Sequence, residues 1–461
     1  MQCDDNEVRE KICSLIREVK RSIRTGVENK TFTPEEETYF YWKIDPSKFA
    51  YTSTGVVCGV REGSYVTRPS WFIVSKQAEK LALESAEYRS LFEALKCYFP
   101  AEIAPEQLLS NLIQKSILKC VSGKWSSDIN EIQLVESVLK DLRGEPVKSG
   151  ALVGLQGVAL ETAVIDLPGG TILRRPTISD LEKEMPANYA PVLSADTSIP
   201  SAILNVSCLA RSPHEVQEEV EKAVAILRLF KTGSVKWLSY KLYSDTVKWH
   251  FGGTLSSGDR FTACDTFLIT KDEVEPLRIF WDEVEAILPR NFFRFEDVRT
   301  DHLAIAYTRY SDAALDTGPI ERRIMTAVMG LEALFLEEKQ ELAYRVKMRI
   351  SKCLYFLQYN PLEVKDRLAD AYDVRNKFAH GSILDKKTKK KLESKYGDVT
   401  TLFKTVLDYL RVSIILTMVC TVEKSVLLHL IDASLVHAES EIRLRAVIAC
   451  CDKLVKHKVI P

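Results

Sequence analysis

The first third of the chain alternates between two patterns of apolar residues. Residues 37–74 are rich in aromatic and β-branched side chains, which predicts a β-hairpin with its turn at Glu62-Gly63-Ser64. Arg143-Gly144-Glu145-Pro146 indicates a domain boundary. Elsewhere in this third, apolar residues recur every three or four positions, which predicts helices over residues 5–29, 75–98, 105–120 and 127–142. Ser75 is the expected N-cap of the second of these helices.

The middle of the chain mixes strand and helix patterns. Pro168-Gly169-Gly170 predicts a turn between two strands. The strand patterns cover residues 151–166, 171–175, 201–210, 235–242 and 261–269, and the helix patterns cover residues 214–230 and 274–288. These patterns predict an α/β or α+β region, and they do not define the order of its strands.

From residue 301 onward the pattern is helical. Pro319 indicates the start of the second helix of residues 301–335. Further helices are predicted over residues 341–350, 363–380, 401–430 and 440–456. The apolar stretch 410–431 contains Arg411, Glu423 and Lys424, which predicts a buried helix rather than a membrane span. The fold class expected is α+β: a mixed N-terminal α/β part (1–148 and 149–300), then an all-α bundle (301–461).

Composition changes this picture little. The 461 residues are 46% hydrophobic and 28% charged, which is typical of a globular protein with two or three domains. A net charge of −1 gives no overall attraction to nucleic acid, so an RNA contact requires a local basic patch. The N-terminus shows no signal-peptide pattern, and the eleven cysteines form no Cys-x-x-Cys pair. We therefore expect reduced thiols, a cytoplasmic location, no membrane association, and neither a metal site nor a cofactor.

The candidate chemistry lies in the segment Asp370–Gly381. It reads as the end of a helix that stops at Gly381 with a left-handed cap. Asn376 and His380 are four residues apart and share a face, whereas Arg375 and His380 are separated by roughly 140° around the axis. An imidazole suits general-base catalysis near neutral pH, and a guanidinium can hold a phosphate. A second copy of the chain could complete such a site.

The hexapeptide Arg375-Asn376-Lys377-Phe378-Ala379-His380 resembles the Arg-x-x-x-x-His signature of HEPN domains, in which a polar residue commonly follows the arginine. Other segments resemble the Apea-like group of that family: 324–335 and 341–350 its first two helices, 402–430 its long closing helix, and 165–177 a segment that precedes such domains. The resemblance implies a helical bundle, metal-independent cleavage of RNA, a composite site in a homodimer or higher even oligomer, and a role in antiviral (phage) defence. It implies Arg375, His380 and Asn376 as the catalytic residues.

Further basic residues are expected to bind RNA around this site. They are Lys377, the dense run Lys386, Lys387, Lys389, Lys390 and Lys391 between two helices, and Arg345 with Arg349. Glu332 is expected to support the site as a partner that positions a motif residue.

Each of these features also has a purely structural interpretation. The lysine run can be a solvated loop, the two arginines can pair with Glu332, Glu338 or Glu341, and His380 can cap its helix. Arg375 can pair with Asp373 or Glu363. The alternative function is therefore a non-catalytic HEPN-like module for dimerisation or for RNA or protein binding. A third hypothesis makes the domain an acceptor in nucleotidyl transfer.

Overall fold

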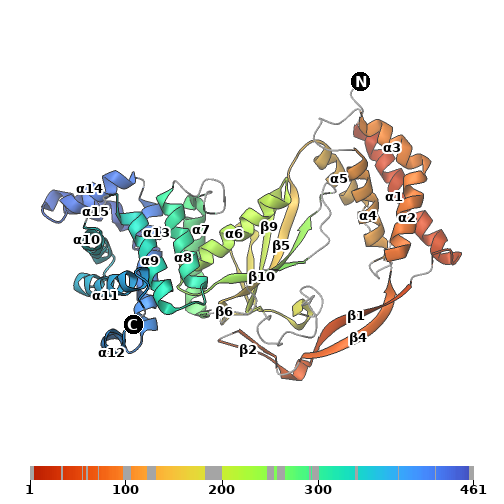
Figure 1. Cartoon of the computed structure of the whole chain (residues 1–461). Coiled ribbons are helices and arrows are strands. Elements are labelled where there is room, and N and C mark those ends of the chain that lie inside the picture. The colour runs from red at the N-terminus through yellow and green to blue at the C-terminus, as the bar shows by residue number, and fades with distance from the viewer. Residues whose placement is uncertain are drawn as a thin grey trace.

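The computed structural model describes residues 5–32, 35–53, 55–58, 61–70, 72–96, 105–121, 131–181, 200–244, 246, 254–256, 265–289, 292, 301–337, 341–382, 384–420 and 422–455. A cluster of N-terminal helices lies at one end of the molecule, a sheet in the middle and a helical bundle at the other end (Figure 1). This arrangement is an α+β fold with a C-terminal helical region, as the pattern predicted.

The N-terminal helices form a hydrophobic core of their own. They are α1 (Asp5–Glu28), α2 (Phe72–Glu84), α3 (Ala86–Lys96), α4 (Pro105–Val121) and α5 (Glu131–Leu142). The predicted helix 75–98 is two helices, because Ser85 interrupts it: its hydroxyl accepts a hydrogen bond from the Tyr88 amide at 3.1 Å and donates to the Ala82 carbonyl at 2.7 Å. Ser75 lies inside α2, so its prediction as an N-cap was wrong.

Two nested hairpins follow α1. Strand β1 (Glu35–Ile44) pairs antiparallel with β4 (Arg61–Ser70), and between them β2 (Phe49–Thr52) pairs with β3 (Gly55–Cys58). Glu62-Gly63-Ser64 lies within β4, paired with residues 41–43, so the predicted turn was wrong. The chain reverses instead between Thr52 and Gly55, whose φ of 114° favours glycine.

The central sheet has the strand order β11-β10-β5-β9-β8-β7 among the described residues. These strands are β5 (Val147–Gln156), β7 (Val164–Asp166), β8 (Ile172–Arg174), β9 (Ala202–Ala210), β10 (Lys236–Ser244) and β11 (Thr254–Ser256), and β6 (Val158–Leu160) pairs in parallel with β12 (Phe267–Ile269). Pro168–Gly170 makes the turn between β7 and β8, as predicted. Helix α6 (Pro213–Phe230) packs on β9 and β5, and α7 (Val274–Ile287) packs on α6. Residues 261–264 of the last predicted strand lie outside the described residues.

The C-terminal bundle begins at residue 302. Its helices are α8 (His302–Leu315), α9 (Ile320–Phe335), α10 (Leu342–Phe356), α11 (Pro361–Ala379), α12 (Lys386–Tyr396), α13 (Val399–Val419), α14 (Lys424–Ala433) and α15 (Ala438–Ile448). Pro319 is the N-cap of α9, as predicted.

The predicted closing helix 402–430 was wrong, because α13 and α14 are separate helices at an angle of 111°. The bend brings the Lys424 ammonium within 2.8 Å of the Ala333 carbonyl and 2.6 Å of the Leu336 carbonyl, where it satisfies the C-terminus of α9. No single helix among the described residues is long and apolar enough to cross a membrane.

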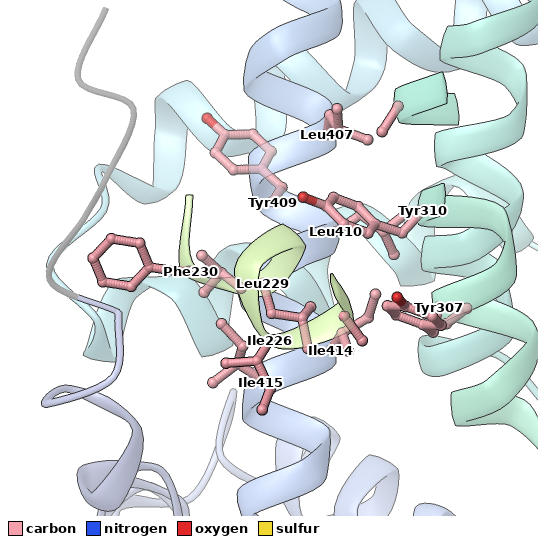
Figure 2. Packing of buried hydrophobic residues seen from close by; sticks show 14 of the residues in the cluster. Ile226, Leu229, Phe230, Tyr307, Tyr310, Leu407, Tyr409, Leu410, Ile414 and Ile415 are labelled. Carbon is pink, nitrogen blue, oxygen red and sulfur yellow. The ribbon is translucent and has the colours of Figure 1, made fainter. Parts of the chain in front are cut away.

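One hydrophobic core joins the sheet to the bundle. Ile226 and Leu229 of α6 lie beside Ile414 of α13, and Tyr310 of α8 lies on the opposite side of this group from Phe230 (Figure 2). At their centre the fully buried Arg411 pairs with Asp408 and donates to the carbonyls of Leu229 (2.8 Å) and Phe230 (3.2 Å). Arg411 therefore satisfies the C-terminal carbonyls of α6. The sheet region and the helical bundle, which the sequence pattern divides at residue 300, share this one core.

Candidate functional site

The helix that carries the candidate motif has well-defined ends. Asn360 caps the N-terminus of α11 by accepting from the Leu362 amide at 3.1 Å. At the other end the Gly381 amide donates to the Phe378 carbonyl and the Ser382 amide to the Lys377 carbonyl, each at 2.9 Å. This pair of bonds, with Gly381 at φ 76°, is a Schellman cap. The left-handed cap predicted at Gly381 is confirmed.

Arg375 is half-buried against α9. Its Nη2 lies 3.4 Å from Glu332 Oε2, and its Nη1 lies 3.1 Å from Asn376 Oδ1. The other carboxylate oxygen of Glu332 accepts from the Tyr372 hydroxyl at 3.1 Å. Glu332 thus holds two side chains of α11 that are three residues apart and share a helix face.

Tyr372 belongs to this site, although the sequence interpretation did not include it. Burial raises the pKa of its hydroxyl, and the neighbouring Glu332 carboxylate raises it further. Tyr372 is therefore a neutral hydrogen-bond donor over the physiological pH range. Its position one turn before Arg375 was the available sequence signal, but only the packing of α11 on α9 shows that both side chains reach the same carboxylate.

His380 lies at the C-cap of α11 with its imidazole exposed. Its backbone amide donates to the Asn376 carbonyl at 3.1 Å, but its ring makes no hydrogen bond or ion pair with any residue that the structure describes. Asn376 is also exposed. The structure therefore joins Arg375 to Asn376 and Glu332, and it leaves the imidazole accessible to solvent at the same helix end.

The lysine run is the start of helix α12, so the alternative interpretation of this run as a solvated loop was wrong. The helix forms because Asp385 caps it, accepting from the Thr388 amide at 2.8 Å, and because Leu392 is buried. Lys377 lies 2.6 Å from Asp385 and also bonds Thr388. The Lys377 hydrogen bond, followed by those from Thr388, lowers the pKa of Asp385. Lys377 therefore connects the end of α11 to the start of α12.

The remaining lysines of α12 divide into two sets. Lys391 lies 3.4 Å from the buried Asp370, which Lys395 approaches to 2.7 Å. Lys389 lies 3.9 Å from Glu393, an exposed pair of little energetic value. The lysines that are exposed on the first turns of the helix are Lys386, Lys387, Lys389 and Lys390.

The two arginines of α10 do not form a phosphate groove. Arg349 is 2% exposed, pairs with Asp432 at 2.6 Å and donates to the Phe335 carbonyl at 2.6 Å. Its assignment as an RNA contact is therefore corrected, because it is a buried structural cation between α9, α10 and α14. Arg345 lies 3.7 Å from Glu341, which agrees with the structural interpretation of this residue.

Comparison with protein-family models, with curated proteins and with solved structures gave no match to this chain. Within the described part of the chain, no group of three or more histidine, cysteine, aspartate or glutamate side chains is arranged to hold a metal ion. An accessible imidazole, an oriented guanidinium and a nearby lysine-rich helix are suited to bind and transform a phosphate ester.

Proposed function

We propose that this protein is a metal-independent endoribonuclease of HEPN type, with a composite site in a homodimer or higher even oligomer, acting in antiviral (phage) defence. The observation that carries the proposal is the exposed imidazole of His380, which has no partner among the described residues. It lies on the same helix end as Arg375, whose guanidinium is oriented by Glu332 and Asn376. The family and its biological setting rest on the resemblance of residues 375–380 and of the flanking helices.

The reaction follows from these groups. The neutral imidazole of His380 takes the proton of a ribose 2′-OH, and the 2′ oxygen attacks the adjacent phosphorus. The P–O5′ bond breaks, and the products are a 2′,3′-cyclic phosphate and a 5′-hydroxyl. Arg375 offsets the negative charge that develops on the phosphate. A guanidinium has five N–H donors, and Arg375 uses two on Asn376 and Glu332, so donors remain for a phosphate oxygen.

The neighbouring helix supplies the attraction for RNA. The exposed lysines of α12 start only six residues after His380, and they provide the local basic patch that the net charge of −1 does not. Phosphate contacts of this kind give affinity that falls as salt concentration rises. In the proposed dimer, the imidazole of one chain and the guanidinium of its partner act on one ribose–phosphate link.

The test is RNA cleavage in EDTA by the full-length wild type and by His380→Ala and Arg375→Ala. His437→Ala and Arg443→Ala are matched controls, because both side chains are exposed and neither belongs to α11 or α12. We expect the two site variants to lose at least a hundredfold in rate, in line with the loss of a general base or of a charge-stabilising group, and the controls to retain activity. Equal cleavage by all five proteins would refute the mechanism.

One observation favours the alternative, a non-catalytic HEPN-like module that binds RNA or protein or dimerises. Arg375 is already paired with Glu332, and Lys377 with Asp385, so both cations have structural partners. For such a module, none of the five proteins cleaves RNA. RNA binding that is weakened by removal of the α12 lysines, without cleavage by the wild type, would identify it.

A further inference from the structure

A pocket of about 700 Å³ lies where α10, α11 and α15 meet, at the outer end of the helical bundle (Figure 1). The end of α10 and the loop that connects it to α11 form most of the lining, and α15 contributes one arginine. A pocket of this volume holds a ligand of the size of a nucleotide. It is lined by Tyr355, Phe356, Gln358, Tyr359, Asn360, Pro361 and Arg445.

Three aromatic rings line this pocket, and one of them is exposed. The Tyr359 hydroxyl donates to Asp408 Oδ2 at 3.0 Å, and the Tyr359 ring packs edge-to-face on Tyr409 with 5.8 Å between the centroids. Tyr355 is 45% exposed, and its ring centroid lies 5.5 Å from that of Phe356. The Tyr355 hydroxyl makes no hydrogen bond with any residue that the structure describes. Exposed aromatic rings of this kind are the surfaces on which nucleic-acid bases stack.

Arg445 is the cation of the pocket. Its guanidinium lies over the Phe356 ring, 5.3 Å from the centroid, and makes no hydrogen bond or ion pair with any described residue. Glu441, four residues earlier on α15, pairs with Lys352 at 3.2 Å, and Glu363 in the first turn of α11 pairs with an arginine of its own helix. None of the described residues that line the pocket is acidic. The guanidinium is therefore available to a phosphate, which it binds through paired hydrogen bonds.

Two amide side chains complete the lining. Gln358 follows α10 with φ 63°, a left-handed position where glycine is the usual residue, and its backbone amide donates to the Tyr355 carbonyl at 3.0 Å. Its side-chain amide has no partner among the described residues, so glutamine costs backbone strain here without a contact that stabilises the fold. Asn360 accepts from the Leu362 and Glu363 amides through Oδ1, which leaves its NH₂ group as a donor. The pocket thus offers free amide donors beside an aromatic ring and a cation.

We propose that this pocket binds a nucleotide with an unpaired base, either a free nucleoside monophosphate or a nucleotide within single-stranded RNA. The base stacks on Tyr355, the phosphate pairs with Arg445, and the Gln358 amide bonds the edge of the base. An amide presents a donor beside an acceptor, which matches the N7 and N6 groups of adenine. The pocket and His380 lie at opposite ends of the 19-residue α11, roughly 28 Å apart at about 1.5 Å per residue, so this binding does not depend on the proposed cleavage.

The test is calorimetric titration of the full-length protein with AMP, adenosine, ribose 5-phosphate and a single-stranded oligoadenylate of about ten nucleotides. Every ribose of the oligonucleotide carries a 2′-O-methyl group, which removes the nucleophile of the proposed cleavage. We expect adenosine and ribose 5-phosphate each to bind at least tenfold more weakly than AMP, because each lacks one of the two main contacts. Binding of AMP identifies a free nucleotide as the ligand, and binding of the oligonucleotide alone identifies single-stranded RNA.

Variants of the pocket separate this site from the lysines of α12. Tyr355→Ala and Arg445→Gln should each weaken binding of the ligand about tenfold or more, because they remove the stacking surface and the phosphate contact. Arg443→Gln is the matched control, since Arg443 is an exposed arginine of the same helix that does not line the pocket. Gln358→Gly should weaken binding and raise the unfolding temperature, because glycine adopts the left-handed backbone without strain.

The outcomes decide the proposal in either direction. Absence of binding of both AMP and the oligonucleotide by the wild type at about 1 mM overturns it. Wild-type affinity in both Tyr355→Ala and Arg445→Gln overturns it as well, as does adenosine or ribose 5-phosphate that binds as tightly as AMP. Circular dichroism checks that each variant is folded. Arg445 is exposed, so Arg445→Gln decides the question if Tyr355→Ala fails to fold.

Discussion

The Glu332 carboxylate is the contact on which the proposed site geometry depends, and its removal gives a prediction with a definite size. Glu332 accepts from the Tyr372 hydroxyl at 3.1 Å and pairs with Arg375 at 3.4 Å. Glu332→Ala leaves both α11 side chains without this partner. The variant should lower the free energy of unfolding and should also release Arg375 from its orientation.

The magnitude follows from the two contacts. Loss of the acceptor for the largely buried Tyr372 hydroxyl costs about 1–3 kcal/mol. The ion pair with Arg375, whose side chain is 30% exposed, adds at most about 1 kcal/mol. Alanine is the better helix former by a few tenths of a kcal/mol, about 0.3. We therefore expect Glu332→Ala to lower the free energy of unfolding by about 1–4 kcal/mol relative to the wild type.

The assay is urea unfolding followed by circular dichroism, with Glu321→Ala in the first turn of α9 as the control. A double-mutant cycle with Tyr372→Phe should give a coupling of about 1–2 kcal/mol, larger than the coupling of Glu332 with Arg375. The raised pKa of Tyr372 also makes the free energy of unfolding depend on pH. The contribution of Tyr372 is present below the pKa of about 10 that tyrosine has in the unfolded chain, and it is lost as the pH rises through the higher pKa of the folded state. Zero coupling between Glu332 and Tyr372 would refute the reasoning.

Two further predictions concern stability alone. Gly157→Ala should destabilise the fold by about 3 kcal/mol or more, because φ at this position is 84° and a Cβ would lie 2.3 Å from the Ser234 carbonyl oxygen. Gly144 has a similar φ of 68° but open space around it, so Gly144→Ala should cost only about 1–2 kcal/mol. Thermal unfolding of the two variants measures the difference. Asp370→Asn should cost about 2 kcal/mol at pH 7. Burial raises the pKa of Asp370, but the hydrogen bonds from Lys395 and Tyr396 outweigh this effect and lower it overall. The stabilisation by Asp370 is therefore present above the pKa of about 4 that aspartate has in the unfolded chain, and it is lost as the pH falls through the lower pKa of the folded state. An unchanged acid-unfolding profile in Asp370→Asn would contradict it.

Local signals in the sequence were sufficient for much of the fold. The apolar stripe of residues 5–29 is buried as α1, Pro319 starts α9 and Gly381 ends α11, because each of these features acts within one or two helical turns. Most of the central strands were also found, but the strand predicted over residues 151–166 is divided among β5, β6 and β7, and β11 was not predicted. The order of the strands in the sheet was not found, since strand pairing joins residues that are far apart in the chain.

The error at residues 402–430 has a long-range cause. The apolar run 402–430 looks like one helix, but Lys424 binds carbonyls at the end of α9, some 90 residues earlier, and the chain bends to place it there. The same holds for the candidate site. The motif of residues 375–380 could be recognised in the sequence. The shared contact of Tyr372 and Arg375 with Glu332 could not, because it depends on how α9 packs on α11.

The proposed cleavage of RNA by the His380 imidazole and the Arg375 guanidinium at the end of α11 can be followed in a single assay. Single-turnover cleavage of a labelled RNA in EDTA is followed across pH with the wild type and His380→Ala. We expect a 2′,3′-cyclic phosphate product, a rate that rises with pH as general-base catalysis requires, and loss of both the rate and that pH dependence in His380→Ala. Cleavage by His380→Ala at the wild-type rate, with the same pH profile, would contradict it.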